Sequence, residues 1–219
     1  MKNILKFQLI LLIIAIIALL IMFANKLFEL HIRSKTMLMV ASTCFVLISL
    51  ISFIGNKGKF SFFIFVGLIF CWFGDSIDNF LLTVIFFLFA HICFISAFIF
   101  YGIDKNKCLK SIPFILLPSI IITYWLYSYI PSFDLPFVIA YIIIISAMVV
   151  FAFGTKPFYW IIILSAILFY ISDIFVARWR FVDTSDINAF FCYPLYYTSC
   201  LLFAFSGKKD IYCVKKIQP

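Results

Sequence analysis

The 219-residue chain is 66% hydrophobic and only 12% charged, with a formal net charge of +8. This composition, with a mean hydropathy of +1.21, excludes a water-soluble globular domain and indicates an integral membrane protein. Membrane topology and anionic lipid headgroups account for the excess of basic residues, and nothing in the sequence suggests nucleic acid as a partner.

Eight apolar stretches of 18 to 21 residues follow one another along the chain. A helix of this length crosses the hydrocarbon core of a bilayer, which is about 30 Å thick. The sequence therefore predicts an all-α membrane protein, a single transmembrane domain over residues 1–219 with eight transmembrane helices. The predicted helices are residues 7–24, 36–54, 60–79, 81–101, 112–130, 136–153, 158–177 and 189–206.

The first apolar stretch follows Lys2 and Lys6 and could also be read as a secretory signal. It is longer than the apolar region of such signals and ends at Asn25-Lys26 without a small-residue cleavage site. We therefore expect an uncleaved first helix.

Residues 60–101 are almost continuously apolar and are interrupted only by Asp75, Ser76, Asp78 and Asn79. One helix over this whole range would be roughly 60 Å long, about twice the thickness of the membrane. The sequence therefore predicts two helices that form a hairpin with its turn near Asn79.

Most of the 17 basic residues fall on the side of the membrane that carries both termini. That side has Lys2, Lys6, Lys57, Lys59, Lys105, Lys107, Lys110, Lys156, Lys208, Lys209, Lys215 and Lys216. The other side has Lys26, Arg33, Lys35, Arg178 and Arg180. By the positive-inside rule we expect both termini in the cytoplasm, and we expect the membrane to be a bacterial inner membrane.

Aspartates lie near the end of two predicted helices, Asp75 and Asp78 in the third and Asp173 in the seventh. A carboxylate in hydrocarbon costs a few kcal/mol, so such residues usually mark functional sites. Asp75 lies 16 residues after Lys59, and Asp173 lies 17 residues after Lys156. The two are therefore expected at similar depth, and a parallel four-plus-four helix repeat would bring them together. We expect their carboxylate oxygens to lie within about 8 Å of each other around one cavity.

Several polar residues have more than one reading at this point. Asp78 could be a solvated or capping residue at the turn. His91, in the middle of the fourth helix, could be a polar packing residue. The two deeper aspartates could also be structural, paired with Arg178, Arg180 or His91.

Seven cysteines show no CxxC spacing, and the chain has only two histidines, His31 and His91. The cysteines are typical of small packing residues. Neither a metal site nor an organic cofactor is indicated.

Four short motifs occur in order along the chain. They are Gly74-Asp75, Ala90-His91-Ile92-Cys93-Phe94, Ser172-Asp173 and Tyr196-Tyr197. Together they resemble the recurring motifs of the YhhN family. The chain departs from the usual pattern at Cys200, where many members have Gln, and at Arg33-Ser34, where Lys-Pro is usual.

The resemblance implies an eight-helix membrane enzyme of the lysoplasmalogenase type. Such enzymes hydrolyse the vinyl ether bond of lysoplasmalogens to a fatty aldehyde and a glycerophospho-alcohol. The expected partners are a lysophospholipid or ether-lipid substrate and the surrounding membrane lipids, while the oligomeric state stays open.

Vinyl ether hydrolysis needs a proton donor and a group that stabilises a cation, and paired carboxylates perform this work in glycosidases. We expect Asp75 and Asp173 to be the acid/base pair. The secondary candidates for contacts with the headgroup and water are Asp78, His91, Tyr193 and Tyr197.

Other classes of membrane protein stay open. An intramembrane aspartyl protease also uses two aspartates, but Phe73-Gly74-Asp75 and Tyr170-Ile171-Ser172-Asp173 do not fit its motifs. A proton-coupled transporter would use the same acids as a relay. A structural or lipid-binding membrane protein would tolerate Asn at both positions.

Overall fold

The computed structural model describes residues 2–28 and 34–207, and every regular element in these ranges is a helix. The eight helices are each long and apolar enough to cross a membrane, so the protein is an integral membrane protein. They are α1 (Lys2–Phe28), α2 (Ser34–Asn56), α3 (Lys59–Ser76), α4 (Phe80–Tyr101), α5 (Lys105–Tyr127), α6 (Leu135–Phe153), α7 (Trp160–Phe181) and α8 (Ile187–Ser206). The predicted fold class is confirmed.

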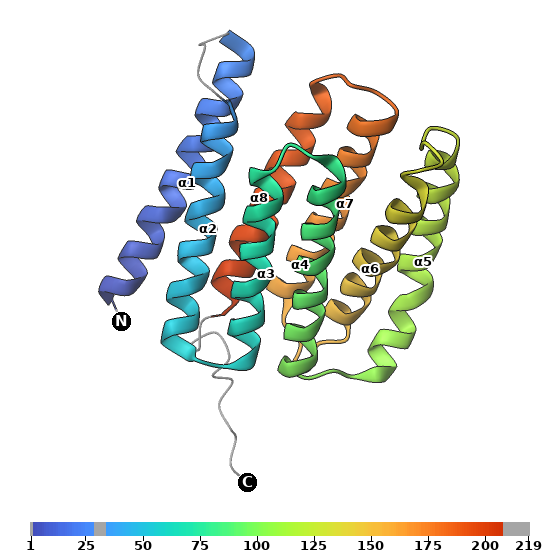
Figure 1. Ribbon diagram of the computed structural model, residues 1–219. Coiled ribbons are helices and arrows are strands. Elements are labelled where there is room, and N and C mark those ends of the chain that lie inside the picture. Colours follow the sequence, from blue (N-terminus) through green and yellow to red (C-terminus); the bar gives the residue numbers. More distant parts are fainter. Residues whose placement is uncertain (1, 29–33, 208–219) are drawn as a thin grey trace.

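Successive helices run in opposite directions through the bundle (Figure 1). The start of α1 and the end of α8 consequently lie at the same end, at the bottom of the view, and the α3–α4 and α7–α8 links lie at the other. His31, Arg33, Lys208, Lys209, Lys215 and Lys216 lie outside the described residues. The cytoplasmic placement of the termini stays a prediction.

Several helix ends differ from their predicted positions, and three of these differences have local reasons. Helix α5 begins at Lys105, before its apolar stretch, because the Asp104 carboxylate caps it by accepting from the backbone N–H groups of Asn106 and Lys107. Helix α3 ends at Ser76, and Asn79 caps α4. Helix α7 continues to Phe181 and not only to residue 177 as predicted, so Arg178 and Arg180 lie in its last turn. Basic residues there stabilise the negative end of the helix dipole.

Helix packing repeats between the two halves of the chain. Helix α2 packs against α8, and α6 packs against α4. In a parallel four-helix repeat, α2 corresponds to α6 and α8 corresponds to α4. The two packed pairs are therefore equivalent. Hydrogen bonds at the end near the termini show the same correspondence between the halves. Where α2 and α8 end, the Asn56 side-chain amide donates to the Gly207 carbonyl at 3.2 Å. In the other half, the Lys156 backbone N–H donates to the Gly102 carbonyl at 2.9 Å.

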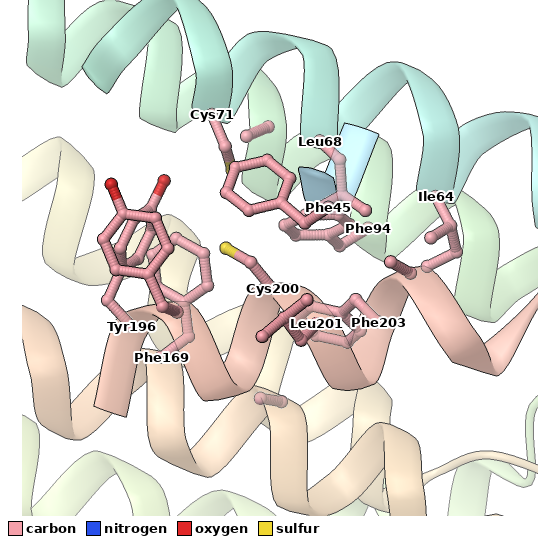
Figure 2. Packing of buried hydrophobic residues seen from close by; sticks show 14 of the residues in the cluster. Phe45, Ile64, Leu68, Cys71, Phe94, Phe169, Tyr196, Cys200, Leu201 and Phe203 are labelled. Carbon is pink, nitrogen blue, oxygen red and sulfur yellow. The ribbon is translucent and has the colours of Figure 1, made fainter. Parts of the chain in front are cut away.

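Aromatic side chains fill the centre of the bundle, where α3, α4, α7 and α8 meet (Figure 2). Phe94 of α4 stacks on Phe203 of α8 with ring centroids 4.5 Å apart. Gly67 of α3 allows Phe94 to approach, because a Cβ at this position would lie 2.6 Å from the ring. Figure 2 also shows Cys71 of α3 and Cys200 of α8 pointing toward each other. This dense packing fixes α3 and α7, which carry the two aspartates.

Candidate functional site

A cavity of about 290 Å³ lies between helices in the half of the bundle opposite the termini. Asp75 of α3 and Asp173 of α7 both line it. Tyr193 and Tyr197 of α8, both predicted site residues, line the same cavity. The rest of the wall is mostly apolar and includes Phe80, Val84, Phe87, Ile122, Leu126, Val138, Ile142, Ile145, Ile174 and Phe181. The structure thus brings the two aspartates, 98 positions apart in the sequence, to one apolar cavity.

Hydroxyl groups surround the carboxylate of Asp75. The Ser42 hydroxyl of α2 donates a hydrogen bond to Oδ2 of Asp75, and the Tyr196 hydroxyl of α8 donates to the same oxygen at 3.0 Å. The Tyr197 hydroxyl lies 3.5 Å from this oxygen and closer, at 3.1 Å, to the carbonyl oxygen of Leu38. Ser42 is fully buried, so its hydroxyl has no competing bulk water. Two close donors therefore fix the Asp75 carboxyl group in one orientation.

The carboxylate of Asp173 has a different environment. The Tyr141 hydroxyl of α6 donates to its Oδ2 at 2.6 Å. Nε2 of His91, on α4, lies 3.7 Å from the same oxygen, which is a close contact but too long for a hydrogen bond. The His91 side chain is fully buried, and within the described residues neither of its ring nitrogens has a hydrogen-bond partner. Its ring meets Phe169 edge-on with centroids 4.7 Å apart. Among the described residues, Asp173 thus has one hydroxyl donor and a buried imidazole beside it.

The two environments are built from equivalent helices. Partners of Asp75 come from α2 and α8, and partners of Asp173 come from α6 and α4. The four-helix repeat relates α2 to α6 and α8 to α4. In this correspondence Ser42 matches Tyr141, and Tyr196 matches His91. The repeat therefore extends from helix packing to the helices that supply the side chains around the two acids.

Ser42, Tyr141 and Tyr196 contact the two acids, but the sequence does not predict them as site residues. Tyr196 belongs to the Tyr196-Tyr197 motif, of which only Tyr197 is a predicted site residue. The two aspartates lie 98 positions apart in the sequence. Adding the same offset to the position of Ser42 in α2 gives a position next to Tyr141. No similar signal distinguishes Ser42 from the other serines of its helix.

The remaining candidates occupy different positions. Tyr193 is half-buried in the cavity wall, and its ring meets that of Trp179 edge-on with centroids 6.0 Å apart. Asp78 lies in the link between α3 and α4, outside the cavity lining, with 89% of its side chain exposed and an ion pair to Lys35. Among the described ion pairs, neither aspartate of the cavity contacts an arginine: Arg178 pairs with Asp183 at 3.0 Å.

No curated protein and no solved structure matches this chain. The model of the YhhN family matches residues 30–207, a range that contains both aspartates and their hydrogen-bond partners. Because the match covers most of the sequence and agrees with the four motifs noted above, the chain belongs to the YhhN family.

Proposed function

We propose that this protein is a membrane-embedded hydrolase of the lysoplasmalogenase type that cleaves the vinyl ether bond of lysolipids. Membership of the YhhN family supports a hydrolase of this kind. The observation that carries the proposal is the position of Asp75 and Asp173 on one apolar cavity. Two carboxyl groups can supply the acid and the base of the reaction, and the apolar wall suits a lipid chain.

The reaction begins with proton transfer from a carboxylic acid to the β carbon of the alkenyl chain. The π electrons of the double bond form the new C–H bond, which leaves an oxocarbenium ion stabilised by the second, anionic carboxylate. Water then adds to the cationic carbon and gives its proton to a carboxylate. The resulting hemiacetal loses the glycerol oxygen as an alcohol and becomes a fatty aldehyde.

The hydroxyl groups around the acids orient them for these steps. Ser42 and Tyr196 direct the carboxyl group of Asp75, and Tyr141 directs that of Asp173. Tyr193 and Tyr197 line the cavity and could position the lipid headgroup or the attacking water. With both termini in the cytoplasm, the cavity would receive its substrate from the opposite leaflet.

A direct assay tests the proposal. Purified full-length protein in nanodiscs is incubated with a 1-alkenyl lysophospholipid, and free aldehyde is measured. The matched control is the 1-alkyl lysophospholipid, which has the same headgroup but no double bond to protonate. We expect aldehyde from the alkenyl lipid alone. An alkenyl lipid that stays intact at high protein concentration would contradict the proposal.

A proton-coupled transporter is the second candidate, favoured by the contact between His91 and Asp173. Buried acid and imidazole groups in membrane helices commonly form proton relays. This function predicts uptake into vesicles that depends on a pH gradient and leaves the transported molecule chemically unchanged. Uptake without aldehyde release would therefore favour transport over hydrolysis.

A further inference from the structure

The end of the bundle where the cavity lies carries four described basic side chains, and three of them are already paired with carboxylates. These pairs are Lys26 with Asp186, Lys35 with Asp78, and Arg178 with Asp183. The fourth is Arg180, which forms no ion pair with any described residue. Its guanidinium carbon lies instead 4.7 Å from the ring centroid of Phe80. Within the described ranges, Arg180 is thus the basic residue at this end that has no carboxylate partner.

Arg180 is directly connected to the wall of the cavity. Its guanidinium lies over Phe80, which lines the cavity. The residues before and after Arg180 in the sequence, Trp179 and Phe181, line the cavity as well. Phe80 and Phe181 meet edge-on with ring centroids 5.6 Å apart. Arg180 itself is exposed. The guanidinium therefore lies at the surface, against Phe80, one of the aromatic residues that line the cavity of the two acids.

We propose that Arg180 binds the headgroup phosphate of the lysolipid substrate and so selects phosphate-bearing lipids; this inference rests on the function proposed above. A guanidinium offers paired N–H donors that match phosphate oxygens, and a ring beneath it leaves its edge free for them. Arg180 lies seven residues after Asp173 on α7, which places it roughly 10 Å farther along the helix. The glycerol unit and the long arginine side chain together span this distance when the alkenyl group lies at the acids.

The test compares two alkenyl lipids that differ only at the headgroup. One is a 1-alkenyl glycerophosphoethanolamine, and the other is the corresponding 1-alkenyl glycerol, which lacks the phosphate. For Arg180→Gln we expect KM for the phosphate lipid to rise about tenfold with little change in kcat, because an interaction equal in ground and transition states is lost. Turnover of the alkenyl glycerol should not change. Arg180→Lys should recover part of the affinity, because it restores the charge but not the paired donors.

Lys59→Gln is the matched control. The Lys59 ammonium lies over the Phe100 ring at 4.8 Å, in a similar contact but at the opposite end of the bundle. This variant should behave as the wild type with both lipids. An equal loss with both lipids in Arg180→Gln, or no loss with the phosphate lipid, would overturn the inference.

Binding of the non-hydrolysable 1-alkyl lysophospholipid, measured by titration in nanodiscs of neutral lipid, separates this inference from the proposed function. We expect the wild type to bind it about tenfold more tightly than Arg180→Gln. If the wild type hydrolyses neither alkenyl lipid but this difference is found, the hydrolase proposal fails and phosphate binding stands. Equal binding by the two proteins overturns the role of Arg180 whatever the turnover.

Discussion

The two halves of the molecule present an aspartate at equivalent places but surround it with different groups. Asp75 has two close hydroxyl donors, Ser42 and Tyr196. Asp173 has one, Tyr141, together with an imidazole that makes no hydrogen bond to any described residue. The same helix arrangement therefore gives two acids of unequal character. Such inequality is what acid/base chemistry requires, because one group must release a proton while the other remains an anion.

The largest expected effect comes from removing either acid. Asn is close to Asp in shape but can supply neither a carboxylic proton nor a negative charge. Asp75→Asn and Asp173→Asn should each lower turnover by ~10²- to 10⁴-fold while leaving a folded, detergent-stable protein. The double variant should be hardly worse than the more damaged single one, because groups that act as a unit are not additive.

Turnover and melting temperature measured together on these three variants decide between catalysis and packing. A structural pair would lower the melting temperature and leave the activity of the surviving protein intact. Undiminished turnover in one single variant would remove that aspartate from the mechanism and end the comparison between the halves.

The second effect follows from the unequal number of donors. Tyr141→Phe removes the one described hydroxyl donor of Asp173, whereas Tyr196→Phe leaves Asp75 with Ser42. Because a hydrogen bond to a charged group contributes ~1.5–3 kcal/mol, Tyr141→Phe should lower kcat about tenfold or more, and Tyr196→Phe only a few-fold. Steady-state kinetics on the two variants measure the difference.

Each of these phenylalanine variants serves as the control for the other, since both lose a single tyrosine hydroxyl from the site. Equal losses of kcat would show that the number of donors does not distinguish the two acids. A larger loss of kcat in Tyr196→Phe would show that Asp75, and not Asp173, depends more strongly on its tyrosine hydroxyl.

The sequence predicted the fold and the shared cavity of the two aspartates for physical reasons, while their role as acids stays a prediction. Apolar runs of membrane length predict helices, and the polar group around Asn79 correctly predicted the α3–α4 turn. Similar depth on two helices predicted that Asp75 and Asp173 share a site, and both line one cavity.

The partners of the acids could not be read in the same way. Ser42 and Tyr141 lie in helices whose apolar residues cover every face, so periodicity does not show which side chains point inward. The predicted end of the seventh helix, at residue 177, was too early because α7 continues past its apolar run to Phe181. Asp78 is one turn from Asp75 in sequence, yet it faces Lys35 outside the cavity lining, a difference that only the turn geometry determines.

The smallest expected effect on turnover concerns His91, the counterpart of Tyr196 in the other half. His91 is fully buried among aromatic rings, and its nitrogens have no hydrogen-bond partner among the described residues. A buried polar group without a partner is destabilising, so His91→Leu should leave the melting temperature unchanged or raise it. If the imidazole assists Asp173 across their 3.7 Å contact, the same variant should lower kcat a few-fold.

These opposite changes in one variant would identify His91 as a residue retained for activity at the expense of stability. His91→Gln keeps a polar group of similar length and is the control, since it should lose the activity without gaining stability. A lower melting temperature with unchanged kcat in His91→Leu would instead make the imidazole a packing residue. Asp173 would then depend on Tyr141 alone among the described groups, and the contrast between the two halves would lie entirely in their hydroxyl donors.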